Sequence, residues 1–188
     1  ANENASDALA RRGAAARAAG ERGVKVVGAG GGRLPKDRAV RSLQVGCGPL
    51  SAQVAARAES VEAQLSLFEA DRRLAERARL SLPRGVAVLD APEELGANAC
   101  DLMLASGVLH PMDGTVLARL GESLASGGVL LAVEPGASLF RDLVFGLKPD
   151  WFEESVDGRP IGRRAAIEGW QRSLTANGSA SVPAQRAA

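Results

Sequence analysis

Residues 43–53, LQVGCGPLSAQ, form a short apolar segment that breaks into two glycines and a proline before the pattern becomes helical. The apolar residues predict a buried strand, and Gly46 and Gly48 predict that it ends abruptly in a loop without bulky side chains. Such a loop lets a ligand approach the backbone, and at a helix N-terminus it is typical of sites for nucleotide-like molecules. A lone pair of glycines is weak evidence, so the interpretation depends on the elements around it.

The rest of the chain repeats an alternation of short apolar runs and amphipathic segments. We expect strands at 42–45, 63–68, 85–89, 100–106 and 127–133, and helices at 51–59, 70–80, 113–126 and 163–178. Asn177 and Gly178 are the expected C-terminal cap of the last helix. Short buried strands that alternate with helices are joined by right-handed crossovers and form a parallel sheet. The sequence therefore predicts an α/β fold of the doubly wound, Rossmann-like type.

The length of 188 residues suits one domain with a sizeable core. Residues 1–40 are expected to form an N-terminal arm and linker, and residues 41–188 the domain, with an irregular tail from about residue 147. Trp151, Phe152 and Trp170 are expected to fill the core between tail and sheet, with substrate contact as the alternative. Because the chain does not begin with methionine, we expect a processed chain or a piece of a longer protein.

The composition argues against several classes of function. The 23 basic and 22 acidic residues nearly cancel and only 3% of residues are aromatic, so nothing favours nucleic acid or carbohydrate as a partner. Cys47 and Cys100 are too few for a disulfide framework or a four-ligand zinc site, and a single histidine, His110, excludes histidine-cluster metal sites. No apolar run is long enough to cross a membrane, and a reducing cytoplasm fits the cysteines.

Carboxylates follow three of the five expected strands, at Glu69, Asp90 and Glu134. Ligands of an open parallel sheet bind beyond the carboxyl ends of its strands, so these residues are candidates for a site. Glu69 lies 23 positions after Gly46, close to the spacing at which an acid binds ribose hydroxyls in Rossmann-type sites. The alternative is that Glu69 is a solvated acid favoured by the dipole of the helix that follows.

Four segments together resemble one protein family. RSLQVGCG (41–48), LSLFEADRRLAERAR (65–79), CDLMLASGVLHPMDGTVLARLGESLASGGVLLAVEP (100–135) and LFRDLVFGLKPDWF (139–152) are similar to the S-adenosylmethionine-dependent C-methyltransferase domains of modular type I polyketide synthases. The resemblance covers about residues 34–178. GVLH, SGGVLLAVEP and LVFGLKPDWF are more specific to this family than the glycine loop.

The resemblance implies a class I methyltransferase fold with S-adenosylmethionine as cofactor. By that resemblance Gly46 and Gly48 form the cofactor loop around Cys47, Glu69 binds the ribose, and Asp90 lies near the adenine. It also implies methyl transfer to the α-carbon of a β-ketoacyl thioester carried by an acyl carrier protein, with neighbouring synthase domains as further partners. The Cys47 thiol itself is expected to have no redox role.

The resemblance further implies that His110 and Glu134 are the catalytic pair. A base must remove a proton from the α-carbon, and a neutral imidazole is suitable near about pH 7. A carboxylate behind the imidazole would hold its tautomer and stabilise its charged form. The alternative for His110 is a polar residue at a strand-to-helix junction, satisfied by backbone. The same base would serve O-methylation, so the acceptor atom stays open.

Two positions depart from the pattern of active family members. Gln44 stands where they usually carry an acid, and Leu50 stands where they carry a third glycine. The family also has a helical lid ahead of the sheet, where this chain has about 40 residues, mostly linker-like. Two interpretations follow: an active methyltransferase whose lid lies outside this sequence, or a pseudo-methyltransferase that has lost its lid and serves a structural role in the synthase.

Overall fold

The computed structural model describes residues 34–109, 112, 114–134 and 167–176. The described residues belong to two compact units. The first unit comprises residues 34–106 and 122–133, and the second comprises residues 107–109, 112, 114–121, 134 and 167–176.

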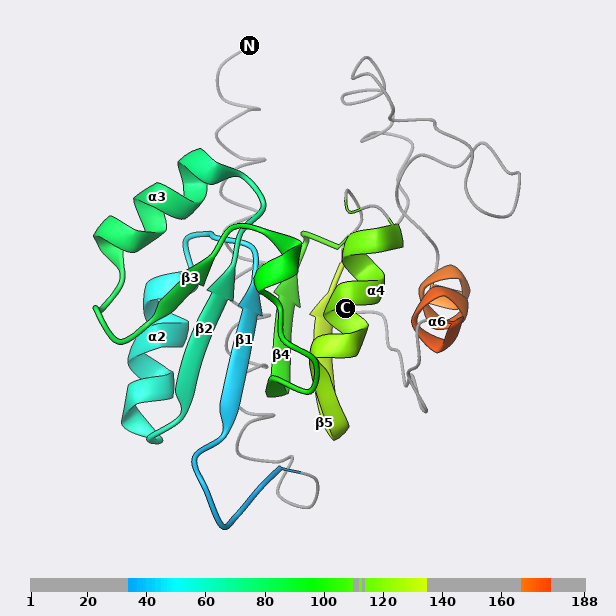
Figure 1. Ribbon diagram of the computed structural model, residues 1–188, viewed down its shortest axis with the longest axis horizontal. Coiled ribbons are helices and arrows are strands. Elements are labelled where there is room, and N and C mark those ends of the chain that lie inside the picture. The colour runs from blue at the N-terminus through cyan, green and yellow to red at the C-terminus, as the bar shows by residue number, and fades with distance from the viewer. Residues whose placement is uncertain (1–33, 110–111, 113, 135–166, 177–188) are drawn as a thin grey trace, which may run out of the picture. The chain divides into compact units, whose positions relative to one another are not determined.

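The first unit contains a five-stranded sheet whose strands all run parallel (Figure 1). Its strands are β1 (Arg41–Val45), β2 (Gln64–Phe68), β3 (Ala87–Leu89), β4 (Cys100–Ser106) and β5 (Leu124–Val133). Their order is β3-β2-β1-β4-β5, so the direction of winding reverses between β1 and β4. A reversal of this kind defines a doubly wound sheet. The predicted α/β, Rossmann-like fold is therefore confirmed.

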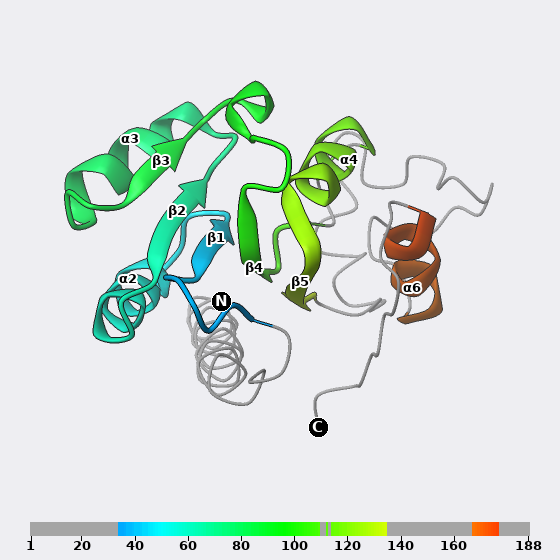
Figure 2. The same ribbon diagram turned by 60° about the horizontal axis from the view of Figure 1, so that its bottom comes forward.

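The first unit contains the helices α2 (Ser51–Ser60) and α3 (Arg72–Ser81). The helix α2 contacts β2, and α3 contacts β3 (Figure 2). Each buries alanines, which let a helix approach a sheet closely, and these are Ala55 and Ala58 in α2 and Ala75 and Ala78 in α3. Asp71 is the N-cap of α3, because its carboxylate accepts the backbone N–H groups of Arg73 and Leu74.

The buried core of the first unit lies on the central strands. Leu67 and Phe68 of β2 have no exposed surface, and Val45 of β1 and Leu102 of β4 are also almost fully buried. Near-continuous apolar runs are expected in parallel strands covered on both faces. The remaining described elements are a short 3₁₀ helix, η1 (Pro92–Glu94), and the helices α4 (Gly114–Ser123) and α6 (Ile167–Ala176).

The predicted boundary between the helix at 113–126 and the strand at 127–133 is wrong. The helix α4 ends at Ser123 and β5 already begins at Leu124, which pairs with Cys100 of β4. Leu124 to Ser126 continue the helical pattern of the sequence, but pairing with a neighbouring strand overrides that local preference. The ladder shifts register between Cys100 and Leu102, and Gly127 has a φ of 77°. Glycine tolerates this left-handed conformation within an irregular strand.

Several sequence predictions concern residues outside the described ranges. These are the arm and the lid region at 1–33, the tail residues Trp151 and Phe152, His110, and the cap residues Asn177 and Gly178. The third aromatic, Trp170, lies partly buried in α6. Within the described ranges, no helix is both long enough and apolar enough to cross a membrane.

Candidate functional site

The carboxyl ends of the five strands are aligned by the register of the sheet. One row of paired residues runs across all five strands: Leu89, Phe68, Val45, Ala105 and Ala132. The residues that directly follow this row on β3, β2 and β1 are Asp90, Glu69 and Gly46. The structure thus places three of the predicted cofactor residues at one edge of the sheet, and Gly46 among them lies next to the point where the strand order reverses.

The glycine loop leaves β1 sharply. Gly46 has a φ of 83°, and its N–H donates to the carbonyl of Phe68 at 2.8 Å, so the loop stays attached to β2. Gly48 is exposed, and apart from its two chain neighbours no heavy atom of the described residues lies within 4 Å of the position that a Cβ would take. The backbone at Gly48 is therefore open to a ligand, as the sequence predicts for a cofactor loop.

Glu69 is bound to the glycine loop directly. Its Oε2 accepts the N–H of Cys47 at 2.7 Å, and its Oε1 accepts the N–H of Asp71 at 3.0 Å. Each carboxylate oxygen has two lone pairs, so both can still accept a hydroxyl from a bound diol. The side chain joins the loop after β1 to the start of α3, so it has a structural role whether or not it also binds a ligand.

Asp90 makes contacts that the sequence did not predict. Its Oδ2 accepts Nη1 of Arg79 on α3 at 3.1 Å in an ion pair. The backbone N–H groups of Asp90 and Ala91 both donate to Oε2 of Glu94, at 2.8 and 3.1 Å. The segment after β3 is thus held by charged groups of its own chain. A ligand that uses these N–H groups has to displace Glu94.

Glu134 belongs to the second unit and directly follows β5 in sequence. Its Oε1 accepts the N–H groups of both Val108 and Leu109, each at 2.9 Å. The carboxylate therefore holds the backbone of the two residues that precede His110. Because His110 lies outside the described residues, the predicted contact between His110 and Glu134 stays a prediction.

The two departures from the family pattern are both buried. Gln44, next to the last residue of β1, is 8% exposed, and Leu50, just before α2, is 9% exposed. The Leu50 carbonyl accepts the N–H of Val54, so Leu50 already takes part in the first turn of the helix. No group of three or more His, Cys, Asp or Glu residues in the described ranges is arranged to hold a metal ion.

The two cysteines differ in exposure. Cys100 is 4% exposed and its Sγ donates to the carbonyl of Ser123, and burial raises the pKa of its thiol to about 11. Cys47 in the glycine loop is partly exposed. Because the thiolate is the nucleophile, we expect Cys100 to react with iodoacetamide at least about tenfold more slowly than Cys47 in the folded protein. Mass spectrometry of alkylated peptides over time measures both rates, with a Cys47→Ser variant as the control. Equal rates would contradict the buried position of Cys100.

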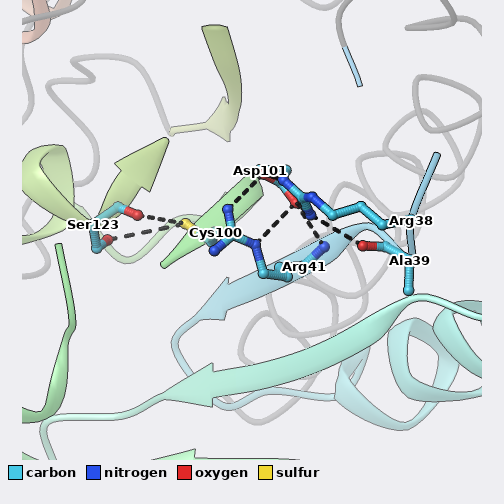
Figure 3. A network of polar contacts seen from close by, with 6 residues as sticks. All are labelled: Arg38, Ala39, Arg41, Cys100, Asp101 and Ser123. Carbon is cyan, nitrogen blue, oxygen red and sulfur yellow. Dashed lines mark hydrogen bonds and ion pairs between the residues drawn. The ribbon is translucent and has the colours of Figure 1, made fainter. Parts of the chain in front are cut away.

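At the amino end of the strands, two arginines converge on one buried aspartate (Figure 3). The carboxylate of Asp101 in β4 accepts both terminal nitrogens of Arg38, at 2.7 and 2.8 Å, and the Nη2 of Arg41 at 2.9 Å. It also accepts the backbone N–H of Arg41 at 3.0 Å. The sequence did not predict this cluster. Its signal is that Asp101 stands within an apolar strand, since a buried carboxylate needs hydrogen-bond partners. This end is opposite to the edge where ligands bind, so we assign the cluster to stability.

A doubly wound parallel sheet with a glycine loop after β1 and an acid after β2 is a Rossmann-like arrangement, and the fold is of the type found in class I methyltransferases. Three solved structures are similar to this chain in fold. A S-adenosylmethionine-dependent methyltransferase from Mesorhizobium loti superposes with a TM-score of 0.54 at 16% identity, covering 78% of this chain and 76% of its own. The [4+2]-cyclase SpnF gives 0.54 at 22% identity, covering 82% of this chain but 56% of its own.

A third structure, of a segment of StiE named as an O-MT, gives a TM-score of 0.50 at 16% identity. It covers 73% of this chain and 45% of its own length. No family model and no curated protein matches the sequence. At these identities the similarity shows the fold alone. One of the three structures is named as a cyclase, so the fold does not by itself indicate methyl transfer.

Proposed function

We propose that the chain is a S-adenosylmethionine-dependent methyltransferase domain that acts on the α-carbon of a β-ketoacyl thioester carried by an acyl carrier protein. The observation that supports the cofactor most directly is the bond between the Glu69 carboxylate and the N–H of Cys47, which joins the predicted ribose-binding acid to the predicted cofactor loop. Acyl carrier protein and other polyketide synthase domains in the cytoplasm are its proposed partners.

The residues present fit the cofactor at two places. The exposed backbone at Gly48 offers an open surface, and Glu69 offers acceptors for the ribose hydroxyls. When bound, the cofactor would supply a sulfonium methyl group. Asp90, paired with Arg79, is the weaker part of the fit, because its carboxylate is already engaged within the chain.

The chain's own part in the reaction is to remove a proton and to hold the group that does so. In the proposal, the imidazole of His110 takes the proton from the α-carbon and leaves an enolate. Glu134 holds the backbone of residues 108 and 109 through its Oε1, and thereby fixes the segment that leads to His110. Glu134 is thus proposed as a positioning residue through these two contacts, in addition to any contact with His110.

The test is calorimetric titration with S-adenosylmethionine, followed by mass spectrometry of a β-ketoacyl pantetheine thioester incubated with enzyme and cofactor. We expect binding and a product with one added methyl on carbon. The His110→Ala variant should bind the cofactor as the wild type does and should lose about 10²- to 10⁴-fold in rate, the usual contribution of a general base. A methyl on oxygen would assign O-methylation instead, and equal rates in both proteins would remove His110 from the mechanism.

The alternative is a pseudo-methyltransferase with a structural role, which the buried Leu50 in place of a glycine favours. A Leu50→Gly variant separates the two functions, with Leu43→Gly on β1 as a control for general loss of stability. If the site has decayed, the wild type does not bind the cofactor and Leu50→Gly gains binding. Binding by both proteins would rule out the decayed site.

A further inference from the structure

Gln44 occupies the position at which the family pattern has an acid, and it contacts the glycine loop directly. Its Nε2 donates to the carbonyl of Gly46 at 3.0 Å and to Oγ of Ser51 at 2.7 Å. A carbonyl can only accept a hydrogen bond, so the nitrogen of the amide, and not its oxygen, has to face Gly46. Both hydrogens of the amide are used in these two bonds.

Ser51 extends this network to the second glycine. It is the first residue of α2 and is 3% exposed, and its Oγ also accepts the N–H of Gly48 at 3.0 Å. The amide of Gln44 therefore holds Gly46 directly and Gly48 through Ser51. The uncharged side chain of Gln44 thus connects both glycines of the loop to β1, the central strand of the sheet.

We propose that Gln44 is the positioning residue of the glycine loop and that it acts as a hydrogen-bond donor, a task that an ionised carboxylate cannot perform. This inference deepens the proposed function and rests on it, since the loop is the proposed cofactor site. The inference also gives a different explanation for the presence of Gln44 where the family pattern has an acid. Gln44 is not simply a lost acid, because the loop of this chain is built around the amide.

The oxygen of the same amide is enclosed by the protein. Oε1 of Gln44 is buried and has no hydrogen-bond partner among the described residues. A buried acceptor without a partner is unfavourable and rare in folded proteins. The orientation of the amide is therefore set by its two donated hydrogen bonds and not by its oxygen.

Replacing Gln44 by glutamate should therefore weaken the site rather than restore it. A carboxylate oxygen would face the carbonyl of Gly46, and two acceptors repel each other. Two neighbours of the introduced carboxylate, Leu104 on β4 and Ser51 on α2, carry no charge. The carboxylate of Glu69, which is bound to the same loop, carries a negative charge. Burial and this like charge would raise the pKa of the introduced carboxyl, and its protonated form would regain one donor.

The experiment titrates S-adenosylhomocysteine into the wild type and into Gln44→Glu, Gln44→Met and Ser51→Ala variants, at about pH 8 and about pH 5.5. We expect Gln44→Glu to bind at least about tenfold more weakly at the higher pH and to recover part of this loss at the lower pH. Gln44→Met, which has no donor, should be weaker at both. Gln53→Glu, an exposed substitution on α2, is the matched control and should change neither value.

Amide hydrogen exchange gives a readout that does not need the ligand. The N–H of Gly48 should exchange faster in Gln44→Glu and Ser51→Ala than in the wild type, and slow again at lower pH only in Gln44→Glu, after correction for the intrinsic pH dependence of exchange. Tighter ligand binding by Gln44→Glu at the higher pH, or unchanged exchange at Gly48, would overturn the donor role. If the wild type does not bind S-adenosylhomocysteine, the proposed function fails, and the exchange data still decide the role of Gln44.

Discussion

Replacing Glu69 by alanine is expected to weaken S-adenosylmethionine binding by about 10- to 100-fold, because a charged hydrogen bond contributes roughly 1.5–3 kcal/mol. The variant removes the acceptors proposed for the ribose hydroxyls. It also frees the N–H of Cys47, which Glu69 holds at 2.7 Å, and so loosens the loop on which the cofactor would lie. Calorimetric titration of the folded variant measures the effect.

A Glu76→Ala variant is the matched control for this prediction. Glu76 is exposed on α3 and carries the same charge, so its removal changes the net charge equally without touching the loop. The control should bind the cofactor as tightly as the wild type. If Glu69→Ala also binds normally, Glu69 is not part of the site, and its contact with Cys47 serves only the structure.

Replacing Asp101 by asparagine is expected to lower the free energy of unfolding by about 2–4 kcal/mol, since the loss leaves two guanidinium groups without their shared carboxylate. The Asp101 side chain is 4% exposed, whereas those of Arg38 and Arg41 are 44% and 35% exposed, so water can compensate the arginines in part. Urea denaturation at neutral pH measures the difference.

The same carboxylate should make stability depend on acid. Hydrogen bonds from Arg38 and then from Arg41 hold the pKa of Asp101 far below its usual range. A carboxyl whose pKa is lower in the folded state than in the unfolded state stabilises the fold above its unfolded pKa, near about 4, and this stabilisation is lost as the pH falls further. The wild type should therefore lose stability below about pH 4 more steeply than Asp101→Asn.

Asp90→Asn provides the comparison for a more exposed ion pair. Asp90 also pairs with one arginine, Arg79, but its side chain is 22% exposed and that of Arg79 is 41% exposed. Ion pairs of this kind contribute about 0–1 kcal/mol, so this variant should be nearly as stable as the wild type. An equal loss in both variants would show that burial is not what makes the Asp101 cluster important.

The sequence by itself determined the class of fold and one edge of the candidate site. Apolar runs at β1, β2 and β4 and the amphipathic segments between them are local patterns, and they predict a parallel sheet without any knowledge of its neighbours. Because all parallel strands end at the same edge, the positions of Gly46 and Glu69 after their strands were enough to place both at that edge, and the structure adds the contact between Glu69 and Cys47.

Only the tertiary structure decided what the remaining polar groups do. The extension of β5 to Leu124 depends on the pairing of Leu124 with Cys100. The carboxylate of Asp101 binds Arg38, which is 63 positions away in the sequence. Gln44 looked like a missing acid, and its role as a donor became visible only from the orientation of the Gly46 carbonyl. The physical reason is common to these cases. Periodicity depends on neighbours along the chain, whereas a buried hydrogen bond depends on register and on the direction of each donor and acceptor, which only the folded backbone sets.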